Sequence, residues 1–466
     1  MRLNKKILIL TLLPLVLSSC GNEEHQTKYV GKNTSVPMLS SVTDYVPYKK
    51  NDKGEIVPLK EFVYPFNTSI NLTVFYEEGT EEPVEIAEKF EKDMMRYHVL
   101  FDRHYYYKEN GKDDVINNVR VINESYGTNE PIKVDKELFD ILVKSKKMME
   151  ISEGKFNITI GNLSSLWDEY IDRASALFDR DDEYVNLSVK NQKIIYVDPD
   201  PAAVELARQS VLTVEELNES LVLDEKNSTV TFKAVPRLEE LNLTPSITLG
   251  GIGKGEATEL FSKSEMAKKH CARINSGTSS IKFTNQRIDG GKWGISFSNP
   301  VYYEKHLAVG MIEDIKLNPV EYRIEKDGSF GLSTSGYYQQ YYFDKETGLR
   351  RHHIINPETG YSNYYTNLDT YEGSFDAITL LMDDAGLSDM YTTALMNTRS
   401  IEEAETLLKE LNKGFGTDGV AFYFKRGKDE KDPNIQELMY VPESLDSSFD
   451  LVSDLKYPLA TKKIVF

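Results

Sequence analysis

Asp389 and Thr393 are four residues apart in a stretch that is expected to be helical. This spacing places a carboxylate and a hydroxyl on the same helix face. A hard cation such as Mg²⁺ accepts one or two such oxygens and keeps positions free for a substrate phosphate. Taken alone, the same pair also suits a solvated helix face.

A glycine cluster, LGGIGKG at Leu249–Gly255, precedes another expected helix. A dinucleotide fingerprint requires glycine where Glu256 stands, and a Walker A loop requires Ser or Thr where Gly255 follows Lys254, so both are excluded. The turn would still expose backbone N–H groups, and Lys254 adds a positive charge for a phosphate. A tight strand-to-helix turn without a ligand is the alternative.

His353 lies in RRHHIINPETG, before an apolar pair and an Asn-Pro turn. Such a histidine could act as a general base near neutral pH, or could simply be hydrogen-bonded at the turn. The chain has no G-x-S-x-G elbow of a hydrolase and no Cys/His cluster for zinc.

The elements that must position these residues mix strands and helices without regular βαβ alternation. Ile70–Tyr76 predicts a strand, and Pro83–Tyr97 and Val134–Ile151 predict amphipathic helices. The Asp-rich region Asp168–Ala207 is expected to be an elaboration outside the core. The pattern favours an α+β fold with mixed or antiparallel sheets flanked by helices.

The N-terminus combines basic residues, an apolar run at Ile7–Leu17 and Leu-Ser-Ser-Cys ending at Cys20. The run is too short for a mature transmembrane helix, and the whole is typical of a secretory signal peptide. Its ending resembles a bacterial lipobox, which predicts lipidation of Cys20; an ordinary signal peptide with an incidental cysteine is the alternative. The polar stretch Gly21–Tyr48 is expected to be a flexible tether.

The charge balance argues against nucleic-acid binding. Lys and Arg number 55 and Asp and Glu number 74, giving a net charge of −19. An acidic chain is a poor candidate for nucleic-acid binding, because that binding depends on Lys and Arg contacts to phosphates. Cys271 is the only cysteine besides Cys20, so we expect no intramolecular disulfide, and we expect Cys271 to be a small buried hydrophobe.

Six segments between Ser69 and Lys425 carry a shared pattern: SEGKFNITIGNLSSLW (Ser152–Trp167), LGGIGKGEATE (Leu249–Glu259), INSGTSSI, WGISFSNP, STSGYYQQYYF with HHIINPETG, and ITLLMDDAGLSDMYTTALM. In their residues and in their order along the chain they resemble the motifs of ApbE-type FAD:protein FMN transferases, in a lipoprotein form. The resemblance implies that FAD is bound with Mg²⁺ at its diphosphate. A threonine hydroxyl of a target protein then attacks the FMN phosphorus, and AMP leaves.

The same resemblance implies roles for individual residues. The metal ligands would be Asp389, Thr393 and the carbonyl of Gly251, with Thr392 assisting, and His353 would be the base. FAD would contact Lys155, Phe156, Asn157, Thr248, Lys254, Ile355 and Tyr107, the last by stacking on a flavin or adenine ring.

The chain departs from the family pattern at several positions. Thr248 replaces an acid, Asn157 and Asn356 each replace an aspartate, and Thr278 replaces a glycine. Phe66-Asn67-Thr68 replaces Met-Gly-Thr. Asn keeps the shape of Asp without its charge.

We therefore expect a signal peptide at 1–19, a tether at 20–65, a transferase domain at 66–425 with an insertion near 168–207, and an extension at 426–466. The enzyme would be a phosphotransferase of class 2.7.1, lipid-anchored at the extracytoplasmic face of the cell membrane. It would modify extracytosolic flavin-accepting redox proteins. An FAD-binding lipoprotein without transfer and an FAD diphosphatase are the alternatives.

Overall fold

The computed structural model describes thirteen stretches of the chain: residues 28–39, 44–176, 195–277, 279–298, 300, 320–337, 340–362, 365–367, 372–373, 375–426, 437–443, 449–451 and 460–464. Cys20 and the signal sequence lie outside them. Within the described stretches, no helix is both long and apolar enough to cross a bilayer.

A nine-stranded sheet forms the centre of the molecule, in the order β1-β4-β10-β11-β14-β19-β20-β21-β23. All neighbouring pairs are antiparallel except β21 and β23, which are parallel. The bounds are β1 Tyr29–Ser35, β4 Ile70–Glu77, β10 Cys271–Ser276, β11 Ser280–Thr284, β14 Phe330–Gly336, β19 Ala377–Met382, β20 Val420–Arg426, β21 Glu437–Val441 and β23 Ala460–Lys463. The predicted α+β class with mixed or antiparallel sheets is confirmed.

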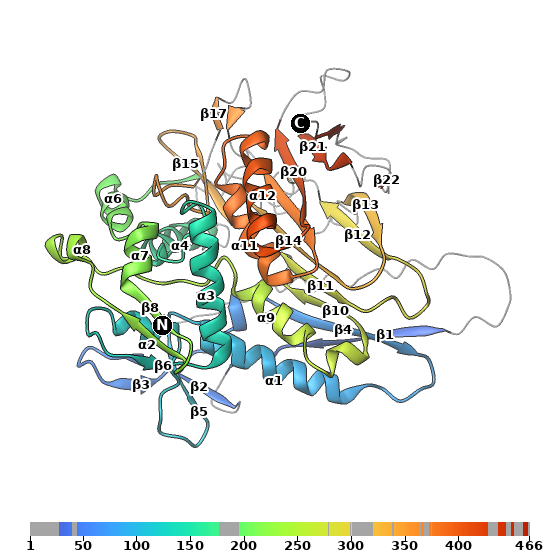
Figure 1. Cartoon of the computed structure of the whole chain (residues 1–466), viewed down its shortest axis with the longest axis horizontal. Coiled ribbons are helices and arrows are strands. Elements are labelled where there is room, and N and C mark those ends of the chain that lie inside the picture. The colour runs from blue at the N-terminus through green and yellow to red at the C-terminus, as the bar shows by residue number, and fades with distance from the viewer. Residues whose placement is uncertain are drawn as a thin grey trace.

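Five helices cover one face of this sheet: α1 Val84–Phe101, α3 Lys136–Ile151, α9 Gly253–Ser262, α11 Ala385–Met396 and α12 Ile401–Phe415 (Figure 1). Side chains along β20 alternate between the two faces. Ala421 and Tyr423 contact the helices, whereas Phe422 and Phe424 point to the other side. The sheet is therefore buried on both faces, with α9 and α11 side by side on one of them.

The opposite face is covered by a small sheet of β12 Trp293–Ser298, β13 Val320–Lys326 and β22 Phe449–Leu451. Trp293, Ile295 and Phe297 of β12 and Ile324 of β13 belong to the second apolar cluster, against which Cys271 packs as a partly buried free thiol. In Figure 1, β12 and β13 lie on the right, away from α1 and α3.

Short elements complete the described parts of the chain. The helices are η1 Pro65–Asn67, α2 Val119–Glu124, α4 Gly161–Ala176, α6 Pro201–Gln209, α7 Val214–Ser220, α8 Pro236–Glu240 and η3 Ala267–Lys269. The strands are β2 Tyr45–Lys50, β3 Ile56–Pro58, β5 Tyr106–Glu109, β6 Ile132–Lys133, β7 Ile195–Tyr196, β8 Leu221–Asp224, β9 Thr229–Phe232, β15 Tyr341–Asp344, β16 Arg350–His352, β17 Tyr365–Asn367 and β18 Glu372–Gly373.

The predicted tether is wrong from Tyr29 onward. Residues Tyr29–Ser35 form β1, which pairs along its whole length with β4, and β2 pairs with β3 and β5. The side chains of β1 are mostly exposed and polar, so its order comes from backbone hydrogen bonds, which leave no apolar periodicity in the sequence.

The described parts of the predicted C-terminal extension and of the predicted insertion also belong to the folded domain. β21 and β23, inside the predicted extension 426–466, continue the central sheet. In the predicted insertion 168–207, Ile171, Ala174 and Val204 are buried with Trp167 against Ile355. Apolar residues at helical spacing anchor this charge-rich segment; residues 177–194 lie outside the described stretches.

Candidate active site

Helix α11 presents the predicted metal ligands. Its first turn is capped by Asp384, whose carboxylate accepts a hydrogen bond from Leu387 N–H at 2.8 Å. Asp389 is 5% exposed. The hydroxyl of Thr393 donates to the Asp389 carbonyl at 3.1 Å, which places both residues on the face directed toward the glycine turn.

The glycine turn before α9 meets this face of α11. The N–H of Gly255 donates to Asp389 Oδ2 at 3.1 Å. A Cβ on Gly255 would lie 2.5 Å from the Ala385 carbonyl oxygen, and a Cβ on Gly251 would lie 3.3 Å from Thr393 Oγ1. The two helices approach this closely only because side chains are absent at both positions.

The Asp389 carboxyl is buried, and burial raises its pKa. The Lys254 ammonium, the Gly255 N–H and the hydroxyls of Ser280 and Ser333 act in the opposite direction. The carboxylate therefore has a cation and several donors around it, but burial is the larger effect.

His353 directly follows β16 at an exposed position. Desolvation by the surrounding protein, together with the Lys254 ammonium, lowers the pKa of His353 to about 4. Lys254 thus acts on both Asp389 and His353, and the ring is neutral at physiological pH.

A small pocket opens beside these groups. Its lining includes six of the predicted site residues, together with three residues that the sequence patterns did not single out: Lys155, Phe156, Asn157, Thr248, Gly251 and Thr393, then Ile160, Pro357 and Asn397. The structure therefore brings together segments that lie more than 200 residues apart in the sequence.

Two of the predicted contacts have other partners in the structure. The amide of Asn157 donates to the Leu212 carbonyl at 2.9 Å, and its oxygen accepts from the N–H and hydroxyl of Thr159 at 2.8 Å. An aspartate could not make the first bond, which accounts for asparagine here. Thr392 is fully buried; its hydroxyl accepts from Ser335 at 2.9 Å and donates to the Asp389 carbonyl at 3.0 Å. Its assistance to the metal stays a prediction.

Tyr107 is not a flavin-stacking residue in this structure. Its ring is completely buried in an apolar cluster with Leu39, Val63 and Met95. The hydroxyl donates to Asp102 Oδ2 at 2.5 Å. Without exposed ring area, it offers no face to a ligand.

Ile355 and Asn397 connect the pocket walls. Ile355 is buried against Trp167, so its side chain is a packing residue. The Asn397 amide donates to the Lys155 carbonyl at 2.9 Å and lies 3.5 Å from the Ile355 carbonyl. The pattern-based prediction missed Asn397, although it lies four residues after Thr393 and eight after Asp389, a spacing that indicates one helix face.

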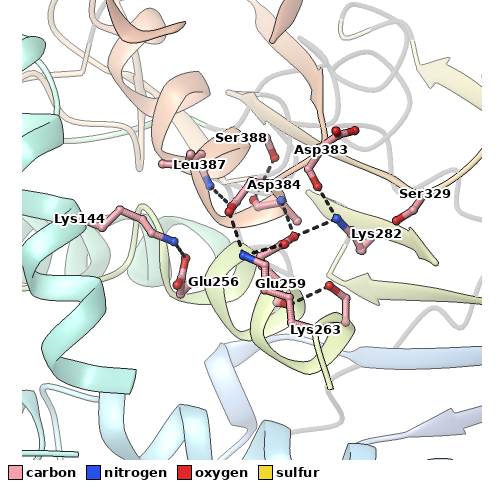
Figure 2. A network of polar contacts seen from close by, with 12 residues as sticks. Lys144, Glu256, Glu259, Lys263, Lys282, Ser329, Asp383, Asp384, Leu387 and Ser388 are labelled. Atoms are coloured by element: carbon pink, nitrogen blue, oxygen red, sulfur yellow. Dashed lines mark hydrogen bonds and ion pairs between the residues drawn. The ribbon is translucent and has the colours of Figure 1, made fainter. Parts of the chain in front are cut away.

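A buried network of charges fixes α9 against α11 (Figure 2). Glu259 lies 3.0 Å from the Lys263 ammonium and 3.1 Å from the Lys282 ammonium, and it accepts the Ala385 N–H at 2.9 Å. Nearby, Glu256 pairs with Lys144 at 2.5 Å. Because Glu259 lies on α9 and is bonded to the first residue of α11, the network holds the start of α11 against the helix that carries Lys254.

Replacing Glu259 with glutamine should lower the free energy of unfolding by about 3 kcal/mol, because Lys282 would remain buried without a counter-charge. Urea denaturation measures the change. Glu265→Gln is the matched control: its pair with Lys268 is exposed on both sides, so unfolding should be almost unaffected. Equal effects of the two variants would contradict the assigned role of the network.

The residues at the site fit a hard cation. Asp389, Thr393 and the carbonyl of Gly251 offer a carboxylate, a hydroxyl and a carbonyl oxygen, the donor types that Mg²⁺ accepts. The close approach of Gly251 to Thr393 supports this set. Among the described residues, no group of three or more His, Cys, Asp or Glu side chains could hold a metal, so a second centre made of such side chains is not found there.

Comparisons with known proteins agree with this site. The model of the ApbE family matches residues 66–416. The solved structures that resemble this chain include the following three. The apbe protein of Thermotoga maritima shares 21% identity over 78% of this chain and 92% of its own, with a TM-score of 0.52. The flavin transferase ApbE of Vibrio cholerae shares 14% identity over 90% of this chain and 100% of its own, with a TM-score of 0.55.

The third is the flavinyl transferase ApbE of Pseudomonas stutzeri in its apo form, which shares 14% identity over 92% of this chain and 99% of its own, with a TM-score of 0.55. At these identities the structures show a common fold. No curated protein sequence matches the chain significantly. Because the family model spans three quarters of the chain, including the glycine turn, His353 and α11, the protein belongs to the ApbE family.

Proposed function

We propose that this protein is an Mg²⁺-dependent FAD:protein FMN transferase, which moves FMN from FAD to a threonine hydroxyl of an extracytosolic target and releases AMP. Membership of the ApbE family supports the proposal, as do the flavin transferase names of two structural neighbours. The observation that carries it is the convergence of Gly251, Asp389 and Thr393 beside Lys254 and the pocket.

The residues present suit phosphoryl transfer, which depends on positioning and charge neutralisation. Asp389, Thr393 and Gly251 would hold the metal, which supplies neutralisation of the diphosphate when bound. Lys254 would offset further phosphate charge. The neutral imidazole of His353 would accept the proton of the target hydroxyl as its oxygen bonds to the FMN phosphorus and the bond to the AMP oxygen breaks.

Intact-mass analysis after incubation with FAD, Mg²⁺ and a secreted target tests the proposal. We expect the target to gain one FMN and AMP to appear in equal amount, with the adduct mapping to a threonine. Free FMN with an unmodified target would instead identify an FAD diphosphatase. Bound FAD that stays intact would identify a binding protein, and either result would overturn the proposed transfer.

We also propose that lipidation at Cys20 holds the enzyme at the extracytoplasmic face of the cell membrane, where exported redox proteins would be its targets. The lipobox-like Leu-Ser-Ser-Cys supports this, and several acyl groups would make the anchoring stable. Cys20→Ser should move the protein from the membrane to the soluble fraction, with Cys271→Ser as the control. A membrane-bound Cys20→Ser variant would refute the anchor.

A further inference from the structure

A turn at Phe66 and Asn67 has an unusual backbone conformation. Phe66 has φ of 55° and Asn67 has φ of 54°, so two consecutive non-glycine residues occupy the left-handed region. A bulky side chain such as phenylalanine rarely adopts this region, and such residues persist only where their surroundings hold them. Two backbone bonds close the turn, from Asn67 N–H to Tyr64 and from Thr68 N–H to Pro65.

His98, on α1, supplies the additional contact to this turn. The N–H of Phe66 donates to His98 Nδ1 at 3.1 Å, and the two rings meet edge to face with centroids 5.3 Å apart. On its other side, His98 Nε2 lies 3.1 Å from the Tyr107 hydroxyl, which donates to Asp102 at 2.5 Å. These partners assign the tautomer: Nδ1 accepts, and Nε2–H donates to Tyr107.

All three polar side chains behind the turn are buried. His98, Asp102 and Tyr107 are each less than a tenth exposed. Burial, with a smaller contribution from His104, lowers the pKa of His98, and Asp102 opposes the shift. A neutral imidazole keeps Nδ1 free to accept, as the contact with Phe66 requires.

The turn in front of His98 supports the start of α9. The Phe66 ring packs on Gly253, where a Cβ would lie 3.4 Å from Cε1, and it also meets the Phe101 ring. Gly253 begins α9 and directly precedes Lys254. Phe66 therefore contacts the backbone that carries both the phosphate-facing lysine and the glycine turn.

We infer that His98 is a positioning residue of the flavin site: it holds the left-handed turn at Phe66 and Asn67 against Gly253, and Asp102 and Tyr107 hold His98 in its accepting orientation. The chain Asp102–Tyr107–His98–Phe66 runs from the buried end of α1 to the first residue of α9. This inference rests on the proposed function, because Lys254 is the group that it positions for FAD.

Paired substitutions at His98 test the inference. His98→Leu removes the acceptor, whereas the Oδ1 of His98→Asn can stand near the position of Nδ1. In His98→Leu we expect faster amide hydrogen exchange in the 62–69 peptide and about a tenfold rise in the KM for FAD, the effect of one lost hydrogen bond, with a similar kcat at saturating FAD. His98→Asn should restore both values toward the wild type.

The possible outcomes separate the inference from the proposed function. If both variants match the wild type, or both are impaired equally, the acceptor role of His98 is refuted. If His98→Leu does not fold, Tyr107→Phe is the variant to test, because it removes only the hydroxyl that orients His98. Unchanged amide exchange in the 62–69 peptide of Tyr107→Phe would overturn the inference. A wild-type protein that does not bind FAD would refute the proposed function. The contact between His98 and the turn would still be tested by hydrogen exchange, which does not depend on FAD.

Discussion

Replacing Asp389 with asparagine should abolish metal-dependent FMN transfer and leave the fold intact. The amide can still accept the Gly255 N–H that Asp389 accepts at 3.1 Å, but it has no charge for the metal. We expect a loss of about 10³-fold, or roughly 4 kcal/mol of transition-state stabilisation. Because the carboxyl is buried and its pKa raised, removing its charge should not lower the melting temperature.

Binding of Mg²⁺ through Asp389 should also depend on pH. A raised pKa means that the carboxyl keeps its proton to a higher pH than an ordinary aspartate, and a protonated carboxyl is a poor ligand. The Mg²⁺ concentration for half-maximal activity should therefore rise as the pH falls. Asp383→Asn, at an exposed carboxylate nearby, is the matched control and should leave turnover unchanged. Full activity in excess EDTA would exclude the assigned metal site.

Replacing His353 with alanine should lower the rate of transfer by about 10²–10⁴-fold, the usual contribution of a general base. FAD affinity, measured by flavin fluorescence, should change much less, because His353 does not line the pocket. Equal losses in rate and affinity would make His353 a binding residue. His270→Ala, between η3 and β10, is the control for loss of an imidazole.

The pH profile separates the base from the metal ligand. With FAD and Mg²⁺ saturating, the neutral His353 is the active form. Its pKa of about 4 predicts a kcat that stays level as the pH falls from 8 to about 5 and declines only below that. A profile that declines around pH 6.5, the ordinary histidine value, would show that the ring is not desolvated.

Several parts of the fold were predictable because they are local. The spacing of Ile86, Phe90 and Met94 marks α1, and these residues are buried as that pattern requires. Asp389 and Thr393 share a face because four residues make about one helical turn. The Gly251–Gly255 cluster marks a close approach, and α11 is what approaches it.

Other predictions failed where side-chain type does not report long-range packing. Tyr107 has an aromatic ring suited to stacking, but the contacts of β5 bury it completely. β1 has polar side chains and is ordered by main-chain pairing with β4, which no residue pattern encodes.

The sequence by itself determined the family, the α+β class and the chemical groups at the site: a carboxylate, a hydroxyl, an ammonium and an imidazole in recognisable motifs. Tertiary structure alone decided which of them meet. Desolvation raises the pKa of Asp389 against the opposing charge of Lys254, and the same two effects act together to lower the pKa of His353. Asn397 joins two pocket walls, and His98 reaches a turn 32 residues earlier in the chain. Desolvation and long-range hydrogen bonds depend on distances in space, and residue order does not contain them.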